Sequence, residues 1–307
     1  MRLVFLGNDP WSVPSVEALA SSSHDLALVV TRNPKPAGRR GDLRATAVAE
    51  AARSLGLPLL ETPTVKRDEG FEAIRSAEPD FLVVVAYGEI LPAAVLELPR
   101  KAPVNVHFSL LPALRGADPV RRAILEGLDE TGVTTMRMDE GMDTGPILLQ
   151  ASEPIRGEDD SGSLGERLAG LGGELLVHTL DGLGSGEVSE RVQDHDLATM
   201  APKMKPEDEW IDWTRPAEEL WRQVRALAPD PGAKTRLRER VLKVVRAGVV
   251  EVPGEAGTIV EASKVRLAVA AGEGTLALEE VIPEGRKRMS GVEFARGQRP
   301  SVGERLG

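Results

Sequence analysis

The segment F-L-V-V-V-A-Y-G at residues 81–88 decides the fold class. It begins after Pro79 and Asp80 and ends in a turn, and its β-branched core is typical of a strand buried on both faces of a parallel sheet. Shorter apolar runs and amphipathic stretches alternate on either side of it. The runs are residues 2–6, 26–31, 104–107 and 132–138, and the stretches are residues 12–20, 46–55, 119–126 and 164–183. This alternation predicts an α/β domain in which helices wind about a parallel sheet.

Length and composition restrict the class of protein further. A chain of 307 residues exceeds what one hydrophobic core usually organises, and its 41% hydrophobic and 28% charged residues exclude a disordered chain. The absence of cysteine excludes disulfides, thiolate metal sites and a thiol nucleophile, and agrees with the cytoplasmic location that we expect. No apolar run approaches about 18 residues, so we expect no membrane span. We also expect a monomer.

The C-terminal part has a different pattern. Residues 190–208 are polar and irregular, which predicts a linker between a domain at 1–189 and a domain at 209–307. Short alternating segments at 241–246, 257–261, 265–270 and 275–282 are typical of a small β-barrel or sandwich.

Charge also divides the chain. Residues 1–204 carry 20 basic and 31 acidic side chains, a net charge of -11, whereas residues 205–307 carry 18 and 17, a net charge of +1. Basic residues gather at 234–246 and 286–288, where they suit the phosphates of a nucleic acid. A solvated strand face is the alternative interpretation.

The stretch N-V-H-F-S-L-L-P at residues 105–112 carries the candidate chemistry. Side chains two residues apart on an extended chain point the same way, so Asn105 and His107 are expected to face one reacting carbonyl. An amide donor and an imidazole suit a developing oxyanion, and Asp143 is expected to complete the site. Because ligands lie beyond the carboxyl ends of strands in open sheets, we expect residues 86–90, 105–112 and 139–145 to converge.

Each of these residues has a simpler interpretation when taken alone. A strand-end asparagine such as Asn105 is commonly a turn former, and many histidines in the position of His107 only satisfy backbone groups. Asp143 alone would be a turn residue of its glycine-rich loop. The three together favour catalysis, because this chemistry needs all of them.

Other cofactor motifs are missing from the sequence. Gly7 does not begin a G-x-G-x-x-G motif, and no G-x-x-x-x-G-K-[ST] motif occurs, so no dinucleotide or nucleoside triphosphate role is indicated. The four histidines (24, 107, 178 and 195) lack metal-ligand spacing, and we expect no metal.

Several motifs together resemble one enzyme family. They are N-V-H-F-S-L-L-P at 105–112, R-G-A-D-P at 115–119, M-D-E-G-M-D-T-G-P-I-L at 138–148, V-V-A-Y-G-E-I-L-P at 84–92, K-P-A-G-R-R at 35–40 and I-D-W at 211–213. With these segments the chain resembles the formyltransferases that use 10-formyltetrahydrofolate. The resemblance covers nearly the whole chain and is greatest to the members that formylate methionyl-initiator tRNA.

The resemblance implies a Rossmann-like, doubly wound formyltransferase domain and a smaller C-terminal β-barrel domain of the OB-fold type that binds tRNA. It implies transfer of a formyl group from 10-formyltetrahydrofolate to the α-amino group of methionyl-initiator tRNA for translation initiation. Asn105 and His107 would then donate to the oxyanion of a tetrahedral intermediate. Asp143 would polarise His107 or relay the proton of the attacking amine.

The resemblance also implies two sets of binding residues. The expected folate-binding residues are Tyr87, Gly88, Ile90, Leu91, Ser109, Leu110, Leu111, Pro112, Asp139 and Gly141. The expected tRNA-binding residues are Lys35, Arg39, Arg40 and Arg44, on a loop that would engage the acceptor end. Residues 87–91 and 109–112 have ordinary strand-end packing and a plain turn as alternatives, and the cationic loop can be a surface loop with incidental charge.

The sequence departs from the family pattern at three places. Phe108 stands where glycine is usual, Asp118 stands where alanine is usual, and A-P-D-P-G-A-K at 228–234 lacks the usual tryptophans. Three rival functions therefore stay open. They are formylation of a nucleotide-linked amino sugar, transfer of the formyl group to water with release of formate, and noncatalytic binding of tRNA.

Overall fold

The computed structural model describes residues 1–37 and 42–307. The chain divides into two compact units, each of which is described by itself. The first contains residues 1–119, 130–154 and 165–202, and the second contains residues 120–129, 155–164 and 203–307. The domain boundaries expected from the sequence, 189/190 and 208/209, stay a prediction.

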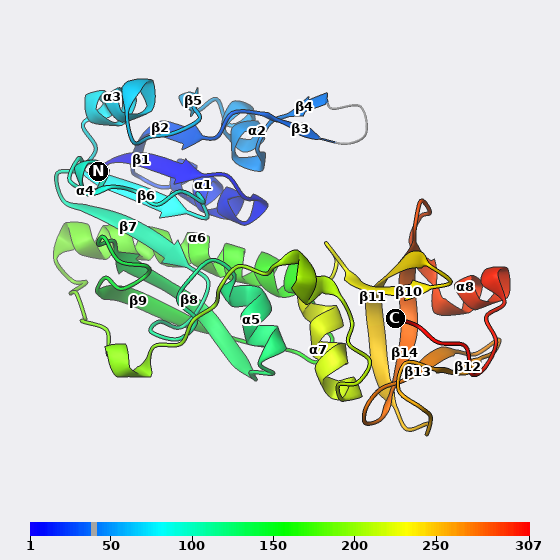
Figure 1. The fold of residues 1–307 in the computed structure, drawn as a ribbon. Helices are drawn as coiled ribbons and strands as arrows, with labels where there is room; N and C mark the ends of the chain where they lie inside the picture. The colour runs from blue at the N-terminus through cyan, green and yellow to red at the C-terminus, as the bar shows by residue number, and fades with distance from the viewer. Residues whose placement is uncertain (38–41) are drawn as a thin grey trace. The chain divides into compact units, whose positions relative to one another are not determined.

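The first unit is built on a seven-stranded sheet in the order β5-β2-β1-β6-β7-β8-β9 (Figure 1). Its strands are β1 (Arg2–Gly7), β2 (Asp25–Thr31), β5 (Leu59–Glu61), β6 (Phe81–Val85), β7 (Ala102–His107), β8 (Glu130–Arg137) and β9 (Ile147–Pro154). The five strands from β5 to β7 are parallel, and β6 is buried along its whole length. The apolar run at 81–85 therefore forms the central, doubly covered strand that its composition predicts.

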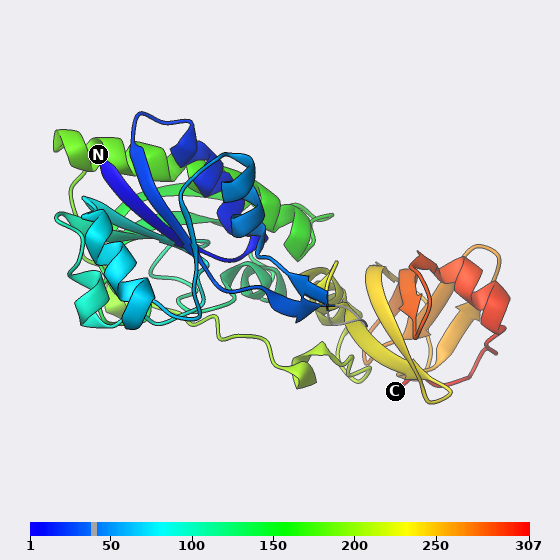
Figure 2. The ribbon, with the colours of Figure 1, turned by 90° about the horizontal axis from the view of Figure 1, so that it is seen from above.

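Helices cover both faces of this sheet (Figure 2). Their bounds are α1 (Val13–Ala20), α2 (Ala47–Ser54), α3 (Asp68–Ala77), α4 (Ala93–Leu96) and α6 (Ser161–Ser185), with a 3-10 turn, η1, at Pro10–Ser12. Val4, Leu6, Leu82 and Val84 form one core cluster together with Ile74 of α3 and Val95 of α4. On the other face α1 approaches α6 closely, because a Cβ at Gly173 would lie only 2.8 Å from the carbonyl oxygen of Pro14.

The direction of β8 differs from the sequence expectation. Residues 132–138 were expected to join a parallel sheet, but β8 runs antiparallel to β7, with Arg137 opposite Val104 and Thr134 opposite His107. The carboxyl end of β8 therefore lies beside the beginning of β7. The argument from strand ends was wrong for residues 139–145, because only parallel strands bring their carboxyl ends to one edge.

The second unit contains an antiparallel sheet in the order β10-β11-β14-β13-β12, with β15 paired to β14 (Figure 1). Its strands are β10 (Ala233–Leu237), β11 (Arg240–Val250), β12 (Ile259–Ala262), β13 (Leu267–Ala270), β14 (Thr275–Pro283) and β15 (Met289–Ser290). Helices α7 (Ala217–Leu227) and α8 (Gly291–Gln298) belong to the same core, through Leu220, Val224 and Phe294. The predicted class, an α/β domain followed by a smaller antiparallel β domain, is confirmed.

Short or half-exposed elements were missed in the sequence. They are β3 (Lys35–Ala37), β4 (Asp42–Arg44), β5, α3, α4, β9, β10, α7, α8, β15 and the 3-10 turns η2 (His195–Leu197) and η3 (Pro206–Glu209), while α5 (Pro119–Leu125) matches its predicted helix. Only Ile147 and Leu148 of β9 are buried, and its remaining residues are half-buried or exposed, so its apolar signal is weak. Among the described helices, none combines the length and apolar character needed to cross a bilayer.

Candidate active site

His107 ends β7 and is fixed by a backbone carbonyl. Its side chain is buried, and its Nε2 lies 2.9 Å from the carbonyl oxygen of Leu114. Because a carbonyl oxygen can only accept, Nε2 carries the hydrogen of this bond. The other ring nitrogen, Nδ1, is therefore the ring atom that is left to interact with a substrate.

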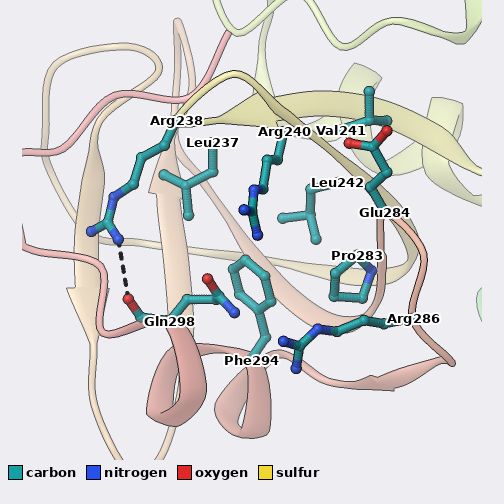
Figure 3. A pocket seen from close by; sticks show the side chains of 10 residues that line it. All are labelled: Leu237, Arg238, Arg240, Val241, Leu242, Pro283, Glu284, Arg286, Phe294 and Gln298. Carbon is teal, nitrogen blue, oxygen red and sulfur yellow. Dashed lines mark hydrogen bonds between the residues drawn. The ribbon is translucent and has the colours of Figure 1, made fainter.

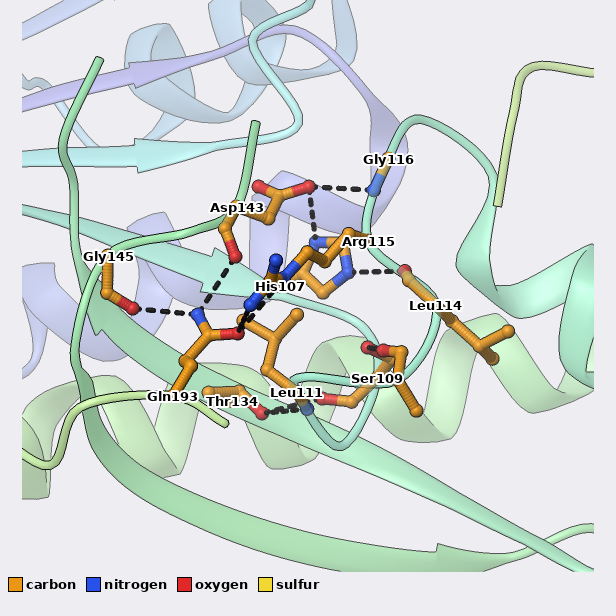
Figure 4. Close-up of polar contacts among 11 residues, drawn as sticks. His107, Ser109, Leu111, Leu114, Arg115, Gly116, Thr134, Asp143, Gly145 and Gln193 are labelled. Atoms are coloured by element: carbon orange, nitrogen blue, oxygen red, sulfur yellow. Dashed lines mark hydrogen bonds and ion pairs between the residues drawn. The ribbon is translucent and has the colours of Figure 1, made fainter. Parts of the chain in front are cut away.

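Asp143 faces this remaining nitrogen. Its Oδ2 lies 3.7 Å from His107 Nδ1 and accepts a hydrogen bond of 2.8 Å from the backbone N–H of Gly116 (Figure 4). In the neutral ring, two acceptors face each other across this gap. A proton on Nδ1 turns the contact into an ion pair with the Asp143 carboxylate.

Asn105 lies on the same side of the sheet as His107. It is the only residue of β7 that is not classed as buried, and its amide makes no hydrogen bond to the described residues. Met136 lies opposite it in the sheet register, and Met136 and Met138 pack with Leu111 and Ile147. The amide of Asn105 is thus available to a ligand beside the His107–Asp143 pair.

The loop from Asp139 to Gly145 reaches His107, although the preceding strand β8 ends beside the beginning of β7 and His107 lies at the end of β7. Met138 packs against two clusters, one with Tyr87 and Leu91 and one with Leu111, so the chain stays on the Asn105 side of the sheet after β8. Asp143 itself adopts a left-handed φ of 53°. Residues without a glycine's freedom keep such a conformation only where their surroundings hold them.

Phe108 points away from this site. Its side chain is buried and meets the ring of Trp11 edge-on, at 6.0 Å between ring centroids. The closest approach to Gly172 of α6 comes from Val106 and Phe108, which share the face opposite Asn105 and His107. The departure from glycine at this position therefore changes the packing beneath the site and not the reacting side of the strand.

Asp118, the second departure, is buried, and its backbone N–H donates to the carbonyl oxygen of Ala201 at 3.1 Å. At the third departure, Pro229 packs against Gly162, and the carbonyl oxygen of Ala228 accepts a 2.6 Å hydrogen bond from Ser161. These contacts occupy the segment in which the family usually has tryptophan.

The candidate folate-binding residues have mixed exposure. Tyr87, Leu91, Ser109 and Leu111 are buried, Leu110 and Pro112 are half-buried, and Gly88, Ile90, Asp139 and Gly141 are exposed. Ile90 is 77% exposed and is the apolar side chain of this set that is presented to solvent. Burial raises the pKa of Tyr87 to about 12, so its hydroxyl stays protonated. Asp139 closes its own loop by accepting hydrogen bonds from Gly141 and Thr144.

The candidate tRNA loop is described only in part. Lys35 and Arg44 are exposed and stand opposite each other in the β3–β4 hairpin. Arg39 and Arg40 lie outside the described residues.

Arginines and lysines at 234–246 and 286–288 in the second unit differ in their contacts. Lys234, Arg238, Arg246 and Arg288 form ion pairs with Glu209, Glu304, Glu279 and Glu280, and Arg236 stacks on Trp210. Arg240 and Arg286 form no ion pair with the described residues. Both line a hollow of about 420 Å³ that is floored by Phe294 and also contains the paired Arg238 (Figure 3).

Two buried polar residues beside the site were missed in the sequence. Arg115 and Gln193 are 6% and 4% exposed and hydrogen-bond to each other next to Asp143 (Figure 4). Arg115 was visible only as part of the R-G-A-D-P motif, and Gln193 lies in a segment that reads as a polar linker. Within the described residues, no three histidine, cysteine or acidic side chains gather to hold a metal ion.

The fold and the site define the class of protein. An amide donor and a carboxylate-paired imidazole on one side of a sheet suit a group-transfer enzyme that stabilises an oxyanion. Residues 1–180 match the family described as formyl transferase, and residues 203–299 match the formyl transferase C-terminal domain. The chain therefore belongs to the formyl transferase family.

Relatives over the whole length are more specific. The chain is 41% identical to the methionyl-tRNA formyltransferase of Citrifermentans bemidjiense, covering 100% of this chain and 96% of that one. It is 42% identical to the methionyl-tRNA formyltransferase of Solibacter usitatus, covering 100% and 99%. A similar fold occurs in HypX from Aquifex aeolicus in complex with tetrahydrofolic acid, with a TM-score of 0.67 and 17% identity over 99% of this chain and 48% of that one.

Proposed function

We propose that this enzyme transfers the formyl group of 10-formyltetrahydrofolate to the α-amino group of methionyl-initiator tRNA. The observation that carries the proposal is the placement of Asp143 beside Nδ1 of His107, with Asn105 on the same side of the strand. Identity of about 41% over the whole chain to methionyl-tRNA formyltransferases supports the tRNA acceptor. We therefore propose that the reaction takes place in the cytoplasm.

The proposed chemistry follows from the available hydrogen-bond donors. The amine nitrogen bonds to the formyl carbon, and the formyl oxygen becomes an oxyanion that accepts from the Asn105 amide and from Nδ1–H of the His107 imidazolium. The oxyanion then collapses, the bond from the formyl carbon to N10 breaks, and N10 takes up a proton while the amine loses one. Asp143 stabilises the imidazolium during both steps.

The nucleophile requires little activation from the protein. An α-amino group titrates near 7.7 to 8.0, so a useful fraction is neutral at about pH 7. Charge stabilisation at the oxygen is therefore the main task of the site.

We further propose that residues 87–91, 109–112, 139 and 141 line the folate site. Exposed Ile90 would lie against the pterin ring, and the buried members of this set would support the wall from behind. Gly88 has open space around it and a φ of 72°, so its backbone can lie close to a ligand.

The acceptor is tested by formyl transfer from 10-formyltetrahydrofolate to methionyl-initiator tRNA. Methionyl-elongator tRNA, an amino-sugar nucleotide and a reaction without acceptor are run in parallel. We expect formylation of the initiator tRNA alone. Formylation of the sugar alone would reject the acceptor, formate release alone would indicate a hydrolase, and tRNA binding without turnover would indicate a binding protein.

We propose that residues 209–307 bind the tRNA backbone and that Lys35, Arg39, Arg40 and Arg44 contact its acceptor end. Arg240 and Arg286 are the best candidates among the arginines of the second unit, because both line the hollow, whereas Arg238, Arg246 and Arg288 are already paired with glutamates. Two guanidinium groups at one hollow suit a phosphate with an adjacent sugar or base.

Replacing both residues with glutamine (R240Q/R286Q) is expected to raise KM for the tRNA about tenfold and to reduce the slope of log K against log salt by about 2. Steady-state kinetics at several salt concentrations measure both, and KM for the folate is expected to stay constant. The matched control R246Q/R288Q removes the same charge from arginines that are already paired. An equal effect of the control would show that net charge, and not contact at the hollow, controls binding.

A further inference from the structure

Gln193 uses its whole side-chain amide within the protein. Its Nε2 donates to the carbonyl oxygens of Asp143 at 2.8 Å and Gly145 at 2.7 Å. Its Oε1 accepts from Arg115, at 3.1 Å from Nε and 2.6 Å from Nη2. One buried side chain thus ties the loop that carries Asp143 to the loop that carries Gly116, whose N–H holds the Asp143 carboxylate.

The segment that carries Gln193 also holds the other side of His107. We call residues 193–201 the clamp segment. The hydroxyl of Thr199 accepts from the backbone N–H of Leu114 at 2.9 Å, and the carbonyl oxygen of Thr199 accepts from that of Arg115 at 2.9 Å. Leu114 is the residue whose carbonyl oxygen accepts from Nε2 of His107. The clamp segment therefore fixes the partners of both ring nitrogens.

Both loops of the network contain a residue with a left-handed backbone conformation. Asp143 and Leu114 have left-handed φ values of 53° and 60°. Aspartate enters this region fairly readily, but leucine keeps such a value only when its surroundings impose it. Arg115 is also buried, so its guanidinium requires the acceptors that Gln193 Oε1 and His195 Nδ1 provide.

We infer that Gln193 is a positioning residue for formyl transfer, acting through Asp143 and assisted by the rest of the clamp segment. It does not touch the reacting atoms. Its amide holds the backbone carbonyl of Asp143 and so fixes the residue whose carboxylate lies 3.7 Å from His107 Nδ1. The inference rests on the proposed function, because it assigns Gln193 a part in that same reaction.

Gln193→Glu is the most selective test. The carboxylate keeps the size of the side chain and its pairing with Arg115, but it has no hydrogen to donate to Asp143 or Gly145. We expect kcat to fall about tenfold, as for other residues that orient a site indirectly. KM for the folate and for the tRNA is expected to change by less than about twofold, because no binding group is removed.

Gln223→Glu is the matched control. Gln223 is also 4% exposed, and its Nε2 donates to two carbonyl oxygens, those of Asp208 at 2.9 Å and Trp210 at 3.0 Å. It belongs to the second compact unit, and its acceptors are not in the loops around His107. We expect a larger fall in melting temperature than in Q193E, because Oε1 of Gln223 has no hydrogen-bond partner among the described residues, and an unchanged kcat, because this buried side chain contacts neither the site nor the solvent.

A double-mutant cycle separates positioning from general destabilisation. In a D143N background, Q193E is expected to lower kcat by less than about twofold, because the group that it positions has lost its charge. A wild-type kcat in Q193E, the same tenfold loss in both backgrounds, or an equal loss of kcat in Q223E would overturn the inference.

If Q193E does not fold, the variant Thr199→Val tests whether the clamp segment positions the site. It preserves shape and removes the acceptor for Leu114 N–H, so we expect kcat to fall about threefold, and a wild-type kcat would reject the clamp. The unsubstituted enzyme is assayed beside every variant. Lack of formylation by that enzyme would reject the proposed function, whereas normal formylation with an unimpaired variant would reject only the present inference.

Discussion

Replacement of His107 with alanine is expected to lower kcat for formyl transfer about 10²-fold or more, because it removes one of the two proposed donors to the oxyanion. The imidazole is buried and oriented by Leu114, so water entering the vacated space would lack its fixed direction and its charge. Single-turnover formylation of methionyl-initiator tRNA measures the chemical step. KM for both substrates is expected to change little, since the lost interaction forms mainly in the transition state.

His178→Ala is the control for this prediction. His178 is an exposed residue of α6, and removing it is expected to leave kcat unchanged. A folded H107A enzyme with the wild-type rate would remove His107 from the mechanism. A large rise in KM with unchanged kcat would instead assign it to substrate binding.

Asp143→Asn is expected to lower kcat by about 10²-fold while the protein remains folded. Asparagine adopts the left-handed conformation required by the φ of 53° as readily as aspartate does, and its amide oxygen can still accept from Gly116 N–H. The substitution thus removes the charge that stabilises the imidazolium and preserves the loop. Circular dichroism melting together with single-turnover rates separates these two effects.

Glu140→Gln is the matched control for this second prediction. Glu140 lies in the same loop and is exposed, so its replacement removes one negative charge near the site without removing the partner of His107. We expect a change in kcat of less than about twofold, as for an exposed, screened charge. An equal loss in E140Q and D143N would mean that the net charge of the loop matters, and not the contact at 3.7 Å.

The local sequence pattern determined the buried central strand and the strand that carries the candidate site. The apolar run at 81–85 is a strand buried on both faces, and the alternation of residues 104–108 separates Asn105 and His107 from Val106 and Phe108. The second result follows because successive side chains of an extended chain point to opposite faces, and this alternation can be read directly from a sequence. The motifs at 105–112 and 138–148 likewise indicate the formyl transferase family.

Only the tertiary structure decided how Asp143 reaches His107 and what holds it there. Strand direction depends on pairing between distant segments, so the antiparallel course of β8 was not visible in residues 132–138. The sequence also could not distinguish paired from unpaired arginines at 234–288, because their glutamate partners lie up to 66 residues away. Gln193 reads as one polar residue of a linker, and its role depends on burial and on four hydrogen bonds made only when three loops meet.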